Sequence, residues 1–409
     1  MENTPFQENN PKRQKLIQPL SEAVAEPLIT ESFAANVTGD APVPRLRMSQ
    51  ADVESYVKNI DHLHECLLTA LQLELSTIPP YLCALYTIRE GSNVEAGKLI
   101  RSVVVEEMLH MILVCNIINA ITDPKKIKKG QKLFDVKKLI PDYPTPLPGN
   151  IVPKMPKGEP PFKVSLLKFS REAISEFTTI ERPSDPNDDL TNPKAFDSIG
   201  QFYQAIRWGL KRLNESTPGG IFKGDPKRQV TPEHYYGSGG KIVKVETYDD
   251  AEEAIAEIVG QGEGIDGTIS TETPIFGEDI EYAHYFKFQE INYGRFYSAN
   301  DTNFHVPVKS IPTGKPFEVT WTAVYNMKEN PKMADYKDQP ELMEKAIDFN
   351  KTYVMLLSNI NDAVSGSPEL LIKGITLMYD LKYKALELMN MPLRDGLCAG
   401  PTFEYVKVD

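Results

Sequence analysis

Apolar residues recur at helical spacing through most of this chain. The longest runs predict two consecutive helices, at residues 49–89 and 93–121. The sequence Glu90-Gly91-Ser92 separates them, as expected for the short turn of a helical hairpin. On the first helix one stripe contains Leu67, Leu71, Glu74, Ile78 and Leu82. On the second helix the matching stripe contains Val103, Glu107, His110 and Val114. Each stripe is apolar except at acids and one histidine, so these polar side chains are expected inside the protein.

The same spacing predicts further helices at 196–214, 249–260, 278–297, 340–364 and 368–388. Short strands are predicted at 241–246 and 317–325. A proline-rich segment, 123–195, is too long for an ordinary bundle loop. We expect it to wrap the bundle as a crossover, anchored by residues 166–169 and 173–177. The pattern therefore predicts a mainly α-helical protein: a four-helix bundle with additional C-terminal helices and a long crossover.

The expected domain organisation is simple. Residues 1–47 are polar and without periodicity, which predicts a disordered tail. Residues 48–406 are expected to form one domain, with the crossover as an insertion and with accessory helices at 335–390.

Candidate metal ligands stand out on the predicted helices. Of the six histidines, only His110 and His284 follow a glutamate three positions earlier, Glu107 and Glu281. Residues i and i+3 share a helix face, so each pair can present a carboxylate and an imidazole together. Glu74 and Glu107 lie equally far from the predicted turn and should face one another across the hairpin.

Two Glu-x-x-His pairs, with one glutamate from each of two other helices, form the ligand set of ferritin-like di-metal proteins. Glu74 supplies one of those glutamates. We expect Glu263, which precedes the 278–297 helix, to supply the other; the alternative is that Glu263 only caps a glycine-rich turn.

Two ambiguities remain in the sequence. Glu106 is also a helix neighbour of His110, although it falls at the edge of the stripe and is expected only to orient the histidine. Pro79 and Pro80 interrupt the first helix one turn after Glu74. The resulting kink either opens room for a second metal or a substrate, or only fits the helix to its neighbours.

Composition narrows the classes of function. A net charge of −12 and a pI near 5.2 argue against a nucleic-acid-binding surface. No apolar run suggests a membrane span, and no secretory signal is evident. The four cysteines show no metal-binding spacing, and three lie in apolar helical segments, as reduced core thiols do. We therefore expect a soluble cytoplasmic protein.

Several segments also carry a family resemblance: 73–82 (Leu-Glu-Leu-Ser-Thr-Ile-Pro-Pro-Tyr-Leu), 105–110, 177–183, 198–203, 261–264, 283–288 and 400–405. Together they resemble the ferritin-like domain of iminophenyl-pyruvate dimer synthases of the violacein-pathway type. The resemblance implies a ferritin-like fold and oxidative coupling of two aromatic imino-pyruvate molecules in secondary metabolism.

We thus expect an oxidoreductase with two metal ions, iron first and manganese second, acting on a small aromatic substrate. Carboxylate and imidazole ligands suit both metals and do not exclude zinc. The alternatives are a di-manganese enzyme that disproportionates peroxide, a metal-binding or storage protein without enzymatic activity, and a scaffold without metal. The sequence does not indicate an oligomeric state.

Overall fold

The computed structural model describes residues 50–153, 155, 159–183, 195–237, 239–262, 270–271, 281–298, 301 and 311–408. The helices below belong to one compact unit that spans residues 41–409. The tail expected at 1–47 lies outside the described residues.

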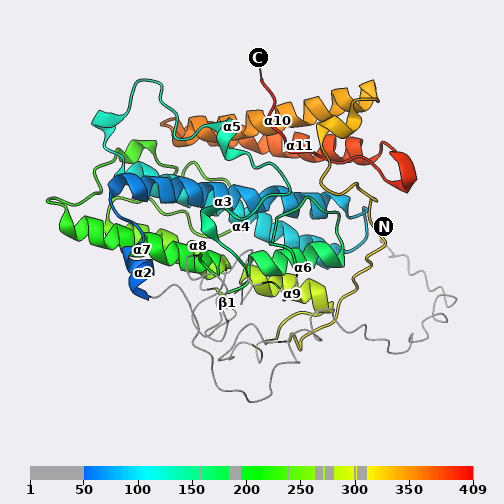
Figure 1. Ribbon diagram of the computed structural model, residues 1–409, viewed down its shortest axis with the longest axis horizontal. Helices are drawn as coiled ribbons and strands as arrows, with labels where there is room; N and C mark the ends of the chain where they lie inside the picture. Colours follow the sequence, from blue (N-terminus) through cyan, green and yellow to red (C-terminus); the bar gives the residue numbers. More distant parts are fainter. Residues whose placement is uncertain are drawn as a thin grey trace, which may run out of the picture. The chain divides into compact units, whose positions relative to one another are not determined.

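A long helical hairpin forms the centre of the fold (Figure 1). It consists of α3 (Ile60–Thr87) and α4 (Val94–Ile121), joined by a turn in which Gly91 has a φ of +78°. This φ favours glycine and explains the break in the pattern there. The predicted first helix is divided, because a short α2 (Gln50–Ser55) precedes α3. Asn59 ends the interruption: its side chain accepts a hydrogen bond from the His62 amide and caps α3.

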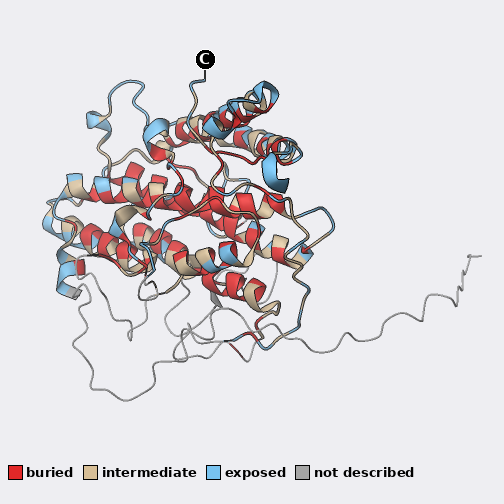
Figure 2. Ribbon diagram, turned by 45° about the vertical axis from the view of Figure 1, so that its right-hand side comes forward, coloured by how far each residue is buried: buried red, intermediate tan, exposed pale blue. Residues whose placement is uncertain are grey.

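Two further layers cover the hairpin on opposite sides. One layer contains α6 (Arg171–Ile180), α7 (Ile199–Ser216), α8 (Tyr248–Gly262) and α9 (His284–Tyr293). The other contains α10 (Pro340–Val364) and α11 (Lys373–Met389). Because α3 and α4 lie between these layers, they are buried along most of their length (Figure 2). The fold is mainly helical, as the sequence predicts.

The remaining elements are short. They are η1 (Pro124–Lys126), α5 (Val136–Leu139), η2 (Pro148–Asn150), η3 (Pro226–Arg228), β1 (Ser270–Thr271), β2 (Glu281–Tyr282), η6 (Met333–Tyr336), η7 (Pro368–Ile372) and η8 (Arg394–Gly396). The crossover anchors are buried as expected, including Leu166, Phe169, Ala173 and Phe177.

Two predicted strands are not strands in the structure. Residues 241–246 and 317–325 form no ladder, and the sheet in the described part of the chain pairs β1 with β2. Side-chain amides take the place of a neighbouring strand at the first segment. The Asn116 amide donates to the Val243 carbonyl at 2.9 Å, and the Gln229 side chain bonds both the N–H and the C=O of Val245. Ile242, Val243 and Val245 of this segment are buried in the core, so its apolar residues reflect packing and not a strand.

The helix predicted from residue 278 begins only at His284. Glu281 instead lies in β2, where its backbone is the register partner of Thr271. The helix-neighbour argument for Glu281 and His284 is therefore wrong.

The helix α4 is long and apolar enough to cross a membrane, with a mean hydropathy of 1.6 over its most apolar window. This segment was not identified as a possible membrane span from the sequence. However, 89% of that window is buried inside the protein, as in the core helix of a helical bundle.

Candidate metal centre

Two acid–histidine groups meet inside the bundle and share one glutamate. The first consists of Glu74, Glu107 and His110, and the second of Glu107, Glu181 and His284. All five residues are buried, and within each group the ligand atoms lie within 4.8 Å of one another. Glu107 therefore stands between two sets of ligands, each with its own histidine and its own second glutamate.

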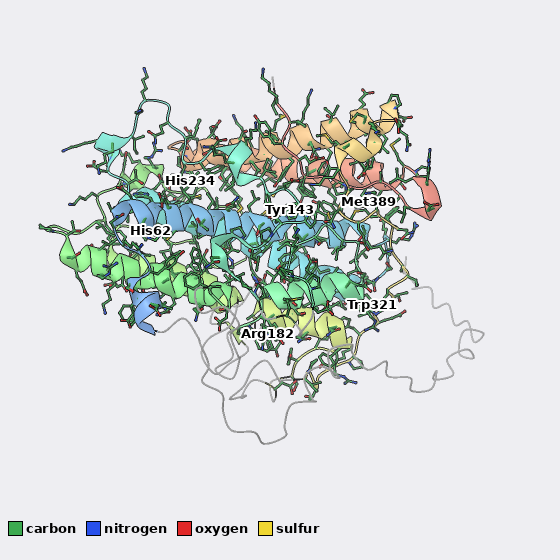
Figure 3. All side chains as sticks on the ribbon, viewed as in Figure 1. His62, Tyr143, Arg182, His234, Trp321 and Met389 are labelled. Atoms are coloured by element: carbon green, nitrogen blue, oxygen red, sulfur yellow. The ribbon has the colours of Figure 1, made fainter. Side chains whose placement is uncertain are left out.

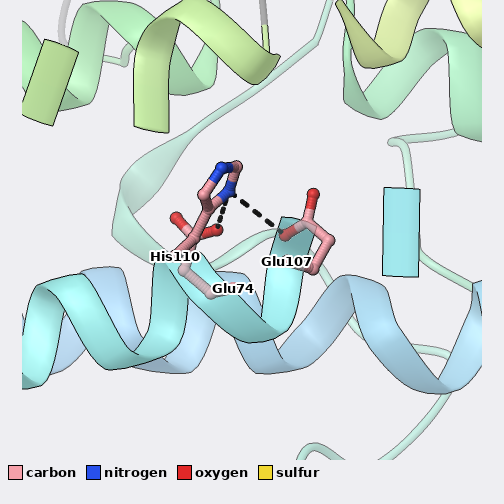
Figure 4. Close-up of side chains that lie close together, drawn as sticks. All are labelled: Glu74, Glu107 and His110. Carbon is pink, nitrogen blue, oxygen red and sulfur yellow. Dashed lines mark ion pairs between the residues drawn. The ribbon is translucent and has the colours of Figure 1, made fainter. Parts of the chain in front are cut away.

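The first group joins the two helices of the hairpin (Figure 4). Nδ1 of His110 lies 3.3 Å from Oε2 of Glu74 and 4.0 Å from Oε2 of Glu107. The prediction that Glu74 and Glu107 face one another is thus confirmed as geometry. Hydroxyl groups hold both acids: Tyr203 donates to Oε1 of Glu74, and Thr77 donates to Oε2 of Glu107 at 3.0 Å.

The second group joins α4 to the ends of α6 and α9. Nδ1 of His284, the first residue of α9, lies 3.0 Å from Oε1 of Glu107 and 3.5 Å from Oε2 of Glu181. Glu181 directly follows α6, and its Oε1 accepts a hydrogen bond from the Tyr81 hydroxyl. The rings of His110 and His284 stack with centroids 5.4 Å apart. The Nδ1 atoms of both histidines therefore face the shared acid.

The side-chain amide of Gln261 contacts the ring nitrogen of His110 that points away from Glu74 and Glu107. This nitrogen, Nε2, lies 2.9 Å from Oε1 of Gln261, whose own amide nitrogen donates to the carbonyl of Gly239 and to Glu257. Because the amide nitrogen of Gln261 donates to these two groups, it is the amide oxygen that faces His110. This oxygen can only accept, so Nε2 of His110 carries a proton. The lone pair for a metal is then on Nδ1, which faces Glu74 and Glu107.

The position of Glu106 differs from the one expected from the sequence. Glu106 does not lie at the bundle edge beside His110 but is fully buried. Its Oε2 lies 2.6 Å from Nε2 of His284, and its Oε1 accepts a hydrogen bond from the Lys287 ammonium at 2.6 Å. Neighbouring residues point about 100° apart on a helix, but α9 contacts both directions on α4: His284 lies beside Glu107 and Glu106, and Lys287 lies beside Glu106.

Burial and charge shift the pKa values in this cluster in different directions. Burial, followed by the nearby Glu181 carboxylate, raises the pKa of Glu107 to about 8. Burial would raise the pKa of Glu74, but contact with His110 outweighs it and lowers the value. Burial would lower the pKa of His284, but Glu181 and then Glu106 and Glu107 raise it well above its usual range. Without metal, protons supply the positive charge that these buried carboxylates require.

The residues fit a pair of metal ions. Among the described residues, Nδ1 of the buried His284 makes no hydrogen bond of suitable geometry, although carboxylate oxygens of Glu107 and Glu181 lie close to it. Buried polar atoms without a partner are rare and call for an explanation such as an ion. Glu74 and His110 would hold one ion, Glu181 and His284 the other, and Glu107 would lie between them. Carboxylate and imidazole donors suit iron, manganese and zinc.

Two further ligands expected from the sequence remain, Glu263 and Glu281. Glu263 lies outside the described residues, and so does the side chain of Glu281. Their roles as ligands stay predictions. His62, near the start of α3, and His234, both labelled in Figure 3, belong to neither acid–histidine group of the described residues.

Glu181 is the ligand candidate that the sequence reasoning missed. The available signal was its position: Ile174, Phe177 and Glu181 follow one another at helical spacing, so the acid continues an apolar stripe. It was overlooked because no histidine is close to it in the sequence.

Comparisons with known proteins found a matching family model and a similar solved structure. A family model described as ferritin-like matches residues 67–293, more than half of the 409 residues. A ferritin-like protein from Caulobacter vibrioides, solved by crystallography, is similar in structure with a TM-score of 0.47 and 19% sequence identity. The similarity covers 84% of this chain and 98% of that one. No curated protein matches the sequence.

Proposed function

We propose that this chain, which belongs to the ferritin-like family, holds two metal ions in the buried acid–histidine groups and uses them to oxidise a small substrate. One observation carries the proposal: Glu107 is shared by two groups, each with its own glutamate and histidine. A carboxylate placed between two ligand sets can bridge two ions, as in other two-metal sites.

Iron is the proposed metal, with manganese as the second choice. Oxygen ligands from three glutamates and one nitrogen from each of two histidines suit these metals better than copper or a thiolate-bound metal. When bound, such a pair supplies two-electron redox chemistry with dioxygen or peroxide.

The residues around the ligands fix their orientation and exclude water. Tyr203 and Tyr81 each donate to the outer oxygen of one glutamate, Glu74 and Glu181, and so leave the other oxygen directed toward a histidine. Tyr81, Phe177 and Phe288 form an aromatic cluster with ring centroids 4.6–5.2 Å apart. This apolar cover keeps the carboxylates in a region of low dielectric, where electrostatic interactions are strong.

The proposed substrate is a small aromatic molecule derived from an amino acid. The support is the resemblance of residues 73–82 and 261–264 to the dimer synthases, because the run around Glu74 is more specific than the Glu-x-x-His spacing. The reaction would then be oxidation or oxidative coupling.

Metal analysis of the full chain tests the proposal. After anaerobic reconstitution with Fe²⁺ or Mn²⁺, two ions per chain are expected. Glu107→Gln should lose both, since it removes the shared ligand, whereas Glu176→Gln, which changes a partly buried acid outside the site, should retain both. Fewer than two ions per chain in the wild type would refute the proposal. Oxygen evolution from added peroxide, without oxidation of aromatic imino acids, would replace the oxidative function with peroxide disproportionation.

A further inference from the structure

The two histidines of the centre have different partners on the side away from the shared acid. Nε2 of His110 faces the neutral amide oxygen of Gln261 at 2.9 Å. Nε2 of His284 lies 2.6 Å from the carboxylate of Glu106. The inner ligands are alike, one histidine and two glutamates in each group, so the outer partner is the main chemical difference between the groups.

The Glu106 carboxylate is itself held by a buried cation. Lys287 lies one helical turn after His284 on α9, and its ammonium donates to Oε1 of Glu106 at 2.6 Å. The side chains of Glu106 and Lys287 are only 1% and 3% exposed. Burying two charges costs several kcal/mol per ion before their attraction is counted, so such a pair is poor evidence for a role in stability. The pair does place a fixed carboxylate beside the outer nitrogen of His284.

From this geometry we infer that the two metal positions are unequal, and that the position at Glu107, Glu181 and His284 binds metal more tightly. A carboxylate beside the outer nitrogen makes an imidazole a more basic ligand than an amide does, and contacts with a charged acceptor are the stronger kind. Glu106 and Lys287 are thus positioning residues for one metal ion, and Gln261 is the weaker counterpart for the other. The inference rests on the proposed two-metal function.

Stepwise titration of the metal-free full chain with Co²⁺, in competition with a chelator, measures the two dissociation constants separately. We expect them to differ by about tenfold or more, the usual range for outer partners of metal-bound histidines. Glu181→Gln should remove the tighter step and Glu74→Gln the weaker one, which assigns each step to its position.

Variants of the outer partners test the cause. The double variant Glu106→Gln/Lys287→Met gives His284 a neutral amide partner like that of His110, and it leaves no unpaired buried charge. Its tighter step should weaken about 10- to 100-fold while the other step stays unchanged, so the two constants converge. Gln261→Met should weaken only the other step and widen the gap. Circular dichroism of each variant confirms that the bundle has folded.

The outcomes separate the two proposals. If the wild type binds fewer than two ions, the proposed function fails. If it binds two ions with equal affinity, or if the double variant weakens both steps equally, the two-metal centre stands but the inequality of its positions is refuted.

Discussion

The hydroxyl of Tyr143, which is labelled in Figure 3, donates a hydrogen bond of 2.8 Å to the main-chain carbonyl of Ser76. Pro80 lacks the amide that would otherwise bond this carbonyl within the helix. The crossover therefore satisfies a group that a proline leaves free, and α3 continues through both prolines. This favours the second alternative for the Pro79-Pro80 pair, namely that it fits the helix to its neighbours, one turn away from Glu74.

Replacing Tyr143 should test this relationship. Tyr143→Phe should lower the free energy of unfolding by about 1–3 kcal/mol, because the buried Ser76 carbonyl loses its partner. In a Pro80→Ala background the cost should be smaller, since the amide restored by that substitution can bond Ser76 directly. Urea unfolding of the four proteins of this double-mutant cycle measures the coupling. Equal costs in both backgrounds would show that the proline and the tyrosine act independently.

A comparison of Glu181 with Glu281 can decide which of the two acids binds metal together with His284. We predict that Glu181→Gln reduces the metal content toward one ion per chain, because Glu181 belongs to only one of the two groups. Glu281→Gln, on a strand outside α9, should retain most of the metal. Elemental analysis of both variants after identical reconstitution measures this. The reverse result would restore the Glu-x-x-His assignment made from the sequence.

Glu176, which lies outside the metal centre, should make the stability of the protein depend on pH. Burial raises the pKa of this carboxyl from 4.5 to about 8, while the Ser165 amide donates to it at 2.6 Å. Between pH 4.5 and about pH 8 the Glu176 carboxyl keeps a proton in the folded state and loses it in the unfolded state. This group therefore makes the free energy of unfolding fall as the pH rises. Glu176→Gln removes the effect and keeps the acceptor. After discounting for its partial exposure, we expect the variant to be more stable than the wild type by about 1–3 kcal/mol at pH 8.

At pH 4.5 the stability gained through Glu176→Gln should nearly vanish. Urea unfolding of metal-free wild type and variant at both pH values gives the comparison, in which contributions from Glu107 cancel. A difference that does not change with pH would show that Glu176 ionises alike in both states.

Two helical glycines should respond oppositely to alanine. A Cβ at Gly209 of α7 would lie 2.6 Å from Cβ of Val57, whereas a Cβ at Gly260 of α8 would meet no atom within 4 Å. Gly209→Ala should therefore cost about 1–3 kcal/mol through overpacking. Gly260→Ala should instead stabilise by about 0.5–1 kcal/mol, because alanine loses less backbone entropy in a helix. Thermal unfolding under identical conditions measures both; a stabilising Gly209→Ala would mean that α7 and the residues after α2 can separate.

The sequence by itself determined the helical hairpin and which polar residues face one another across it. Apolar spacing and the Glu90–Ser92 break depend only on neighbouring residues. They predicted a helix at 93–121, where α4 spans Val94–Ile121, and they placed Glu74 opposite Glu107 and His110. The accessory helix α10 also has the predicted bounds, Pro340–Val364. Each of these features follows from local periodicity and from one short turn.

Only the tertiary structure decided the rest of the centre. Glu181 enters through the packing of α6 against α9, and Glu106 becomes internal because His284 and Lys287 of α9 pack against it. The helix before His284 was overestimated, since backbone pairing with Thr271 outweighs the local pattern at Glu281. Contacts between residues far apart in the chain decide these positions, and the spacing of residues along a sequence does not predict such contacts.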